Sequence, residues 1–449
     1  MSTAQVSPDV AVSGALKFIT CGSVDDGKST LIGRLLVDSK TVLLDQLAGV
    51  QRAGETDLAL LTDGLSAERE QGITIDVAYR YFATAQRKFI IGDAPGHEQY
   101  TRNMVTAASS ADAAVVLVDA TKLNWATQFE NSDASTHALL PQTRRHSLLT
   151  HLLRVPSIVF AINKLDAVVD PAHPDAAATA FERIRTAVEV FAQAAGITVA
   201  AIVPISALKG WNVVDRAEDH VGNRNPHWCG YEGLSLLQIL EQLPCASEAA
   251  DQAFAFPVQW VEKFSSSSDT SQGRRVFWGR VAAGSVTPGQ EVTVFPSGKN
   301  AVVAQVLDQA RAPKDIQAGH SAGIVLDREV DVSRGDWLLA TGSYPATREL
   351  QATVAWMDDE PLVAGRVYWA LHGHRWVKAR VKRIVHRLDV NTLAEEDATQ
   401  LEANAIGHVE LSLQGDLVTL PYSESRILGA LVLVDTASNK TAGAVLVRG

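Results

Sequence analysis

The feature that most constrains this chain is the stretch Gly22-Ser-Val-Asp-Asp-Gly-Lys-Ser29, which lies between an apolar run at residues 16–20 and a helical-looking segment at residues 30–37. Its spacing, G-x-x-x-x-G-K-S between a strand and a helix, is that of a phosphate-binding loop. The glycines let backbone N–H groups approach phosphate oxygens. Lys28 would reach the terminal phosphates, and the Ser29 hydroxyl would complete a Mg²⁺ shell. Because such a pattern also occurs by chance in Gly-rich turns, further motifs elsewhere in the chain are needed to distinguish a nucleotide site from an ordinary turn.

Length and composition bound the class of protein. At 449 residues the chain is too long for one hydrophobic core, so we expect two to four domains. Hydrophobic residues make up 46% and charged residues 20%, which is ordinary for a soluble globular protein. No apolar run reaches membrane-spanning length, and the polar residues 1–9 lack a signal-peptide core, so we expect no membrane partner.

The cysteines and the net charge bear on compartment and partners. Cys21, Cys229 and Cys245 follow no metal or disulfide spacing, which fits a reduced, cytoplasmic setting. The formal net charge of −11 argues against non-specific binding to nucleic acid, although it leaves room for a local basic patch. We therefore expect no nucleic-acid partner.

Residues 1–247 predict an α/β domain, because apolar strands alternate with helices as in a parallel sheet covered on both faces. The expected strands are residues 15–20, 88–91, 113–119, 157–163 and 200–204. Functional residues should gather at the carboxyl ends of these strands.

Two segments after the phosphate loop predict contacts to a γ-phosphate and its metal. Asp93-Ala-Pro-Gly-His97 follows the expected strand at residues 88–91, so Asp93 would hold a metal-bound water and Gly96 would offer its N–H to the γ-phosphate. Such a segment is also an ordinary turn composition. Thr74, in Gly72-Ile-Thr-Ile75, is the candidate for a second hydroxyl on Mg²⁺, with a charged helix running into a strand as the alternative.

The base is predicted to be guanine. Asn163-Lys-Leu-Asp166 ends the apolar run at residues 157–162, and the Asp166 carboxylate can accept two hydrogen bonds from the guanine N1–H and 2-amino group. Adenine offers no matching donor edge. Asn163 would tie neighbouring loops together, the Lys164 stem would cover a face of the base, and Ala207, in Ser206-Ala-Leu208, would present its N–H to guanine O6. Four motifs, each at the end of an expected strand, together predict GTP binding. They are residues 22–29, 93–97, 163–166 and 206–208.

These motifs together resemble the translation-factor class of GTPases, the relatives of elongation factor Tu. The resemblance implies that His97 orients the attacking water. It also implies that Val24 and Ile73 are the apolar pair that keeps the histidine out of the nucleotide site until a partner binds.

The match within that class is narrower. The stretches at residues 69–79, 87–90, 97–104 and 142–147, together with Asp26, resemble the large subunit of bacterial sulfate adenylyltransferase. This resemblance implies a GTPase that associates with a smaller catalytic subunit, which makes adenosine 5′-phosphosulfate and pyrophosphate from ATP and sulfate in sulfate assimilation. Because that adenylyl transfer is uphill, GTP hydrolysis would supply the drive.

The motifs and the resemblance give a defined set of expected site residues. The expected catalytic residues are His97, Lys28 and Thr74, and the Mg²⁺ ligands are Ser29, Thr74 and, through a water, Asp93. The expected contacts to GTP are Gly22, Ser23, Val24, Asp25, Asp26, Gly27, Lys28, Ser29, Thr30, Asp93, Ala94, Pro95, Gly96, His97, Asn163, Lys164, Asp166, Ser206, Ala207 and Leu208.

The rest of the chain predicts two all-β, barrel-like domains, residues 248–347 and 348–449. The expected strands are residues 256–261, 276–282, 291–295, 301–307 and 323–326 in the first, and 353–357, 367–371, 377–384, 407–413 and 430–435 in the second. We expect a solvated hairpin tip rather than a phosphosite in the serine-rich residues 264–273, and no metal at His372-Gly-His374.

Some features stay open at the level of sequence. The loops at residues 122–139 and 211–233 are longer than the family usually has, and a partner contact there is one interpretation. No second phosphate loop follows, so a fused adenylylsulfate kinase is expected to be absent. The alternatives to an energy-coupling GTPase are a translation-type carrier of aminoacyl-tRNA and a GTP-gated scaffold without coupled chemistry.

Overall fold

The computed structural model describes residues 15–39, 51–52, 55–56, 58, 74, 76–97, 100–123, 139–168, 175–216, 228–245, 250–263, 275–389 and 394–449. The chain divides into two compact units, Met1–Ala246 with Val390–Leu393 (unit 1) and Ser247–Asp389 with Ala394–Gly449 (unit 2), and each is described by itself. Ile73, the serine-rich residues 264–273 and most of the loop at residues 122–139 lie outside the described residues.

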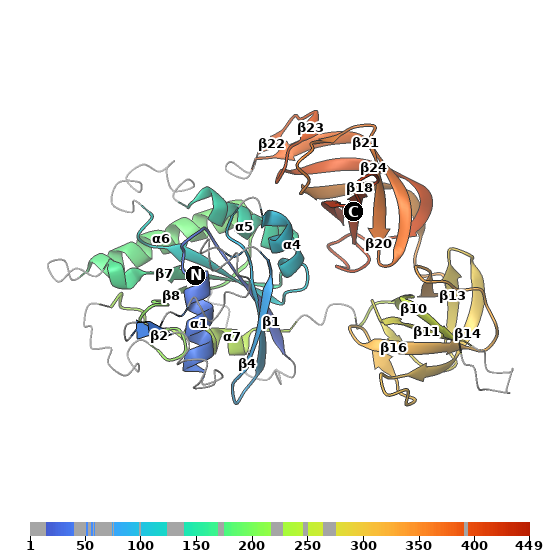
Figure 1. Ribbon diagram of the computed structural model, residues 1–449, viewed down its shortest axis with the longest axis horizontal. Coiled ribbons are helices and arrows are strands. Elements are labelled where there is room, and N and C mark those ends of the chain that lie inside the picture. Colours follow the sequence, from blue (N-terminus) through green and yellow to red (C-terminus); the bar gives the residue numbers. More distant parts are fainter. Residues whose placement is uncertain are drawn as a thin grey trace. The chain divides into compact units, whose positions relative to one another are not determined.

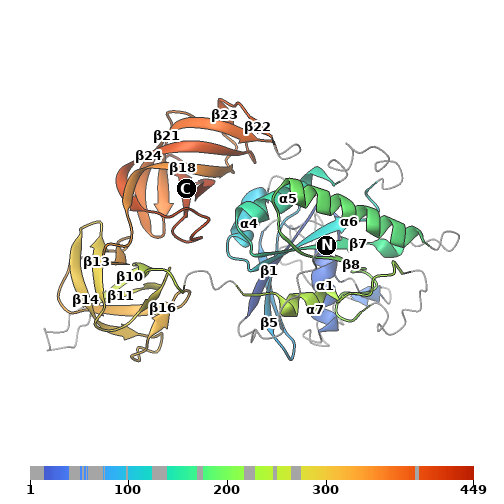
Figure 2. The same ribbon diagram turned by 180° about the vertical axis from the view of Figure 1, so that it is seen from behind.

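Unit 1 is built on a six-stranded sheet with helices on both faces (Figures 1 and 2). The strand order is β4-β5-β1-β6-β7-β8, in which only the β4–β5 pair is antiparallel. The strands are β1 (Leu16–Cys21), β4 (Ala78–Ala83), β5 (Lys88–Asp93), β6 (Ala113–Asp119), β7 (Ser157–Asn163) and β8 (Val199–Pro204), with a separate small pair of β2 (Gln51–Arg52) and β3 (Glu55–Thr56). The helices are α1 (Lys28–Asp38), α4 (Thr101–Ala108), α5 (Pro141–Leu152), α6 (Ala176–Ala194), α7 (Leu236–Gln242) and the 3₁₀ helix η4 (Leu165–Ala167).

The local sequence explains these elements. Every residue of β6 and β7 is buried, as expected of central parallel strands covered on both faces. α7 begins at a capping box in which the Ser235 hydroxyl accepts the Gln238 N–H and the Gln238 side chain accepts the Ser235 N–H. Because β1, β5, β6, β7 and β8 are parallel, their carboxyl ends meet at one edge of the sheet, where the loops after each strand converge.

Unit 2 contains two seven-stranded sheets. The first has the order β10-β11-β16-β14-β13-β17-β9, and its two end strands are consecutive in the chain. Its strands are β9 (Ala255–Pro257), β10 (Trp260–Lys263), β11 (Arg275–Arg280), β13 (Glu291–Phe295), β14 (Lys299–Leu307), β16 (Ser321–Leu326) and β17 (Trp337–Ala340), beside the small pair β12 (Ser285–Val286) and β15 (Ile316–Gln317). The expected single strand at residues 256–261 is wrong: β9 ends at Pro257, and Val258 donates instead to the Asp336 carbonyl, which turns the chain into β10.

The second sheet is a closed barrel. Its order is β20-β25-β26-β18-β24-β21-β22, and an additional β20–β21 pairing completes the ring. Its strands are β18 (Ala346–Trp356), β20 (Val367–His372), β21 (Arg375–Leu388), β22 (Glu395–Glu396), β24 (Ile406–Val418), β25 (Ala430–Asp435) and β26 (Thr441–Val447), beside the pair β19 (Leu362–Val363) and β23 (Gln400–Leu401).

Each sheet of unit 2 encloses an apolar core, and a third cluster joins the two sheets. Trp337 and Leu339 of β17 pack in that cluster with Val418 of β24 and with Leu428, which lies between β24 and β25. Unit 2 is therefore held together by buried apolar contacts between its two parts. Across the described residues, no helix combines the length and the hydropathy that a membrane span requires.

Candidate nucleotide site

The loop after β1 has a backbone that suits glycine. Gly22 and Gly27 have φ values of 144° and 94°, in the left-handed region, and Asp25 has a φ of 61°. A Cβ on Gly27 would lie 2.5 Å from the Asn163 Nδ2, so a side chain there would collide with the end of β7. The sequence pattern is therefore matched by a close approach between the loop and the neighbouring strand end.

Lys28, the first residue of α1, points back along the loop. Its ammonium donates to the Ser23 carbonyl at 2.7 Å and to the Gly22 carbonyl at 3.3 Å. The side chain is buried, and burial lowers the pKa of Lys28, while the Asp26 and Asp93 carboxylates act in the opposite direction. A Cβ on Gly96 would lie 2.5 Å from the Lys28 Nζ, so Gly96 lies close to Lys28 and a larger residue would collide with its ammonium.

One cavity brings the separate motifs together. It has a volume of about 330 Å³ and is lined by residues from the phosphate loop, from the segment before β4, from the loop after β5 and from the loop after β7. The lining residues are Val24, Asp25, Gly27, Lys28, Ser29, Thr30, Thr74, Gly96, His97 and Lys164. All ten are among the residues that the sequence predicts, although they come from four segments of the chain.

The other predicted residues do not line this cavity. They are Gly22, Ser23, Asp26, Asp93, Ala94, Pro95, Asn163, Asp166, Ser206, Ala207 and Leu208. Asp166 lies in η4, and Leu208 is 61% exposed.

Asp93 sits where a metal-holding carboxylate is expected. It is buried at the end of β5, and its two oxygens are each 3.4 Å from a threonine hydroxyl, that of Thr20 on β1 and that of Thr74. Ser29 and Thr74 both line the cavity. Hydroxyl and carboxylate oxygens are the ligands that Mg²⁺ prefers, so the residues present fit this ion.

Asn163 ties neighbouring loops together, as its place in the motif predicts. Its Nδ2 donates to the Asp26 carbonyl at 2.8 Å, and its Oδ1 accepts the Ala207 N–H at 3.0 Å. Arg34 of α1 reaches the same segment, with its Nε 3.2 Å from the Ala207 carbonyl. A single buried amide thus links the phosphate loop to the loop after β8.

Two lysines form a network that the motifs do not predict. The Lys164 ammonium lies 2.8 Å from the Asp119 Oδ2 at the end of β6 and donates to the Asp25 carbonyl at 2.6 Å. The Lys122 ammonium lies 3.0 Å from the Asp26 Oδ1 and also donates to the Val24 carbonyl. Burial raises the pKa of Asp26, and the Lys122 ammonium opposes that rise.

His146 of α5 is a further residue that motif reasoning missed. Its Nδ1 accepts the Gly22 N–H at 3.1 Å, and its Nε2 lies 3.1 Å from the Gln142 amide. The ring is fully buried; burial, followed by the Lys28 and Arg145 charges, lowers the pKa of His146 to about 3. The sequence signal was available only as part of the family stretch at residues 142–147.

His97 lines the cavity, and its ring centroid is 6.3 Å from that of Tyr100. Val24, one member of the expected apolar pair, lines the same cavity, whereas Ile73 lies outside the described residues.

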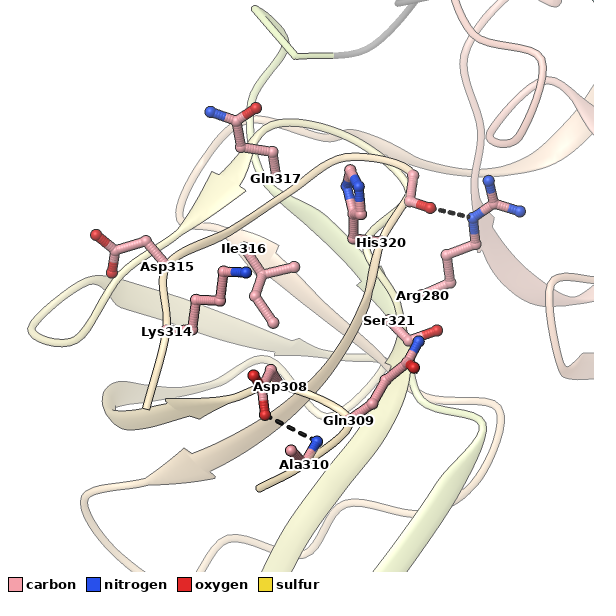
Figure 3. Close-up of a pocket in the computed structure, with 11 residues that line it drawn as sticks. Arg280, Asp308, Gln309, Ala310, Lys314, Asp315, Ile316, Gln317, His320 and Ser321 are labelled. Atoms are coloured by element: carbon pink, nitrogen blue, oxygen red, sulfur yellow. Dashed lines mark hydrogen bonds between the residues drawn. The ribbon is translucent and has the colours of Figure 1, made fainter. Parts of the chain in front are cut away.

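Unit 2 has a larger cavity, of about 680 Å³, without any of the nucleotide motifs (Figure 3). Its lining mixes both signs of charge, since it includes Arg280 and Lys314 as well as Asp308 and Asp315. The Arg280 guanidinium is already bonded to the Gly319 carbonyl at 2.8 Å. Volume alone therefore does not identify the functional site of this chain.

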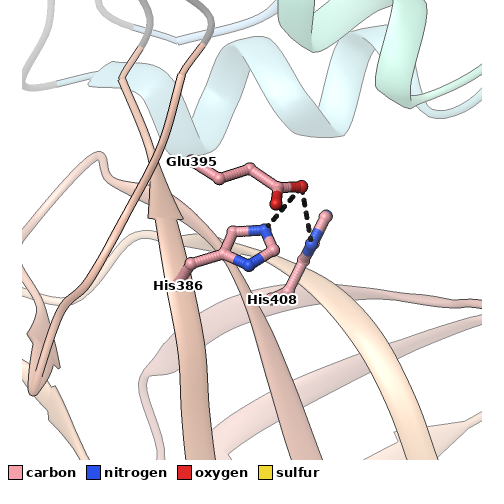
Figure 4. A group of neighbouring side chains, drawn as sticks. All are labelled: His386, Glu395 and His408. Atoms are coloured by element: carbon pink, nitrogen blue, oxygen red, sulfur yellow. Dashed lines mark ion pairs between the residues drawn. The ribbon is translucent and has the colours of Figure 1, made fainter.

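Unit 2 also brings two histidines and a glutamate together. His386 and His408 face each other across β21 and β24, and the His386 Nε2 lies 3.1 Å from the Glu395 Oε1 (Figure 4). The His408 Nδ1 accepts from the Arg448 guanidinium at 2.6 Å. A cation at that ring nitrogen opposes a metal ion there. In the His372-Gly-His374 segment, the Nε2 of the buried His372 already has a protein partner: it lies 3.1 Å from the Leu428 carbonyl.

Comparison with known proteins decides the family. A model described as "Elongation factor Tu GTP binding domain" matches residues 14–245, and one described as "GTP-eEF1A C-terminal domain-like" matches residues 349–448. The chain is 43% identical to sulfate adenylyltransferase subunit 1 of Laribacter hongkongensis (strain HLHK9), covering 96% of this chain and 85% of that protein. The chain belongs to the sulfate adenylyltransferase subunit 1 family.

Other relatives agree with the sulfate adenylyltransferase subunit 1 family. The protein of that name from Vibrio campbellii (strain ATCC BAA-1116) is 43% identical, with 96% of this chain and 86% of that protein covered. The bifunctional enzyme CysN/CysC of Xylella fastidiosa (strain Temecula1 / ATCC 700964) is 44% identical; the alignment covers 96% of this chain and 65% of that protein. The predicted family, the GTPase fold with barrel domains and the GTPase-subunit interpretation are thereby confirmed, and the carrier of aminoacyl-tRNA is disfavoured.

Proposed function

We propose that this chain binds and hydrolyses GTP and uses the conformational change to drive a smaller catalytic subunit that makes adenosine 5′-phosphosulfate and pyrophosphate from ATP and sulfate. The observation that carries the proposal is the cavity in which the phosphate loop, Thr74, Gly96 and His97 meet. The relatives' printed name, subunit 1, supports a complex with a second subunit. The formal net charge of −11 supports a partner that is protein rather than nucleic acid.

The cavity residues have distinct roles in this proposal. Lys28 binds the terminal phosphates and stabilises the charge that develops in the transition state. Gly96 offers its N–H to the γ-phosphate, and its closeness to Lys28 supports that placement. His97 orients the attacking water. When bound, Mg²⁺, held by Ser29, Thr74 and through a water by Asp93, would neutralise charge on the phosphate oxygens.

Specificity for guanine is assigned to the loops after β7 and β8. Asp166 accepts from the N1–H and 2-amino group of the base, and the Ala207 N–H, bonded in this structure to the Asn163 Oδ1, would be shared with O6 when the base is bound. The Asn163 side chain fixes the two loops against each other through its bonds to Asp26 and Ala207. A base without those donors would leave the Asp166 carboxylate unpaired.

Coupling is assigned to release of the switch segments. Thr74 and Gly96 both contact the γ-phosphate group or its metal in the GTP-bound form, so hydrolysis frees both and changes the surface shown to the partner. We further propose three domains, residues 1–247, 248–347 and 348–449, and a cytoplasmic location, which the three free cysteines support.

Two measurements test the proposal. The first titrates GTP and ATP into the purified chain, and equal affinity for the two nucleotides would overturn it. The second measures GTP turnover and adenosine phosphosulfate formation with and without the second subunit. A GTPase whose turnover stays independent of adenylyl transfer would support the uncoupled scaffold instead, and a salt-sensitive, GTP-dependent tRNA complex would support the translation-type carrier.

A further inference from the structure

The start of the phosphate loop is held by three side chains, two from the motif itself and one from outside it. The Gly22 N–H is bonded to the His146 Nδ1, and the next peptide is bonded on both sides: its carbonyl accepts from Lys28, and its N–H, that of Ser23, donates to the Asp26 Oδ2 at 2.6 Å. Two consecutive peptides are therefore fixed by three side chains. Of the three, only His146 comes from another part of the chain, 124 positions away.

The hydrogen bonds of His146 determine its tautomer. Since the Nδ1 accepts a backbone N–H, its lone pair is in use and the ring proton must be on the Nε2. The atom that faces the Nε2, 3.1 Å away and one turn earlier on α5, is the Gln142 amide nitrogen. Since a protonated Nε2 needs an acceptor, the bond requires this side-chain amide to be turned by 180°, with its oxygen toward the ring. The ring is fully buried close to the Lys28 ammonium, an environment that keeps it neutral.

We propose that His146 is a positioning residue of the GTP site, whose neutral ring, oriented by Gln142, accepts the Gly22 N–H and presets the phosphate loop for the nucleotide. The inference rests on the proposed binding of GTP at this loop. Gly22 does not line the cavity, so the bond holds the loop at its base and leaves the residues that face the phosphates in place.

The physical reason is the cost of an unpaired buried N–H. Without an acceptor, the buried Gly22 N–H is left unsatisfied, so the loop relaxes into other conformations that find it a partner. Binding then has to restore the competent conformation, and the apparent affinity falls by the fraction that is competent.

The variants His146→Leu and His146→Asn separate this role from packing. Leucine fills the space without an acceptor, whereas the asparagine oxygen occupies roughly the position of the Nδ1. We expect GTP affinity, measured with a fluorescent GTP analogue, to fall roughly tenfold in His146→Leu and to stay within about threefold of the parent in His146→Asn. His151→Leu, a half-buried histidine on the same helix, is the matched control and should bind as the parent does.

The outcomes are distinguishable. A His146→Leu variant that binds like the parent, or an asparagine variant as weak as the leucine variant, would overturn the inference, because a purely structural role lowers thermal stability without this pattern of affinities. If His146→Leu does not fold, His146→Gln replaces it, since the longer amide reaches the Nε2 position instead. A parent chain that does not bind GTP would overturn the proposed function itself, whereas binding by the parent with unchanged variants overturns only the role of His146.

Discussion

The two units differ in where they place charge. Unit 1 buries charged and ionisable side chains next to the phosphate loop, among them Asp26, Lys28, Asp93, Asp119 and His146. In unit 2 several ion pairs of the closed barrel lie on the surface, as in Arg348–Asp416, Lys382–Glu349 and Arg383–Glu410. Its buried Asp435 is paired with the partly exposed Arg366. Since burying charge is expensive, its concentration at one sheet edge indicates chemistry there, while unit 2 is stabilised by apolar packing.

The largest effect expected from this contrast is on base recognition in unit 1. Asp166→Asn reverses the donor and acceptor pattern offered to guanine, so GTP affinity should fall on the order of 10⁴-fold and xanthosine triphosphate should become the preferred ligand. Parallel titrations of the two nucleotides measure this. Asp175→Asn, an exposed carboxylate before α6, is the control, and loss of affinity there would contradict a local explanation.

The stability of unit 2 should instead fall when buried apolar volume is removed. Trp337 is fully buried in the cluster that joins the two sheets, so Trp337→Ala should cost about 3–5 kcal/mol in the free energy of unfolding. Urea denaturation of the whole chain measures it, with the half-exposed Trp376→Ala as control. GTP affinity should not change. A parallel loss of GTP binding would show that the nucleotide site in unit 1 depends on the packing of unit 2.

The hydrolysis step should be separable from binding. His97→Ala should keep GTP affinity near the parent value and lower the turnover rate roughly 10²-fold, because the water is no longer oriented. Release of inorganic phosphate in single-turnover experiments measures the rate. Normal turnover in this variant would show that His97 does not place the water.

A buried histidine gives unit 2 a pH dependence of its own. Burial lowers the pKa of His372 from its ordinary 6.5 to about 4, so the unfolded chain binds this proton more readily than the folded one. Its contribution to stability is complete above pH 6.5 and is lost as the pH falls toward 4. His372→Phe should therefore flatten the decline in urea midpoint between pH 6.5 and 4. An unchanged slope would show that another group causes the decline.

The smallest effect is expected at the surface of unit 2. Lys382→Ala breaks the pair with Glu349, in which both side chains are largely exposed and the ammonium is 2.9 Å from the carboxylate. Because water and salt screen such pairs, the urea midpoint should shift far less than in Trp337→Ala. A comparable shift would mean that unit 2 depends on its ion pairs after all.

Much of the fold could be predicted from continuous apolar runs. Strands β5, β6, β7 and β8 lie within two residues of their expected bounds at each end, because runs such as residues 157–163 are buried along their whole length. β4 was missed because its side chains are mostly exposed or half-buried at the sheet edge, and β26 because its Thr-Ala-Gly-Ala start carries little strand signal.

The site was predictable only where a motif is local. The phosphate loop, Asp93-Ala-Pro-Gly-His97 and Asn163-Lys-Leu-Asp166 each combine a strand end with a short pattern, so their residues could be named in advance. His146 and Lys122 contact the loop across 124 and 96 positions of the chain. No spacing along the sequence encodes such contacts, since they depend on which strands become neighbours in the sheet.

The ring of strands in the second barrel limits how another protein can use it. β20 pairs with both β25 and β21, so each strand of the ring has a hydrogen-bonded neighbour on both sides. The ring consists of β20, β25, β26, β18, β24 and β21. Among the described strands of this sheet, only the two-residue β22, which pairs with β21 outside the ring, is an edge to which a foreign strand can be added. A subunit that docks on this barrel must therefore recognise its side chains, and its affinity will follow their shape and charge.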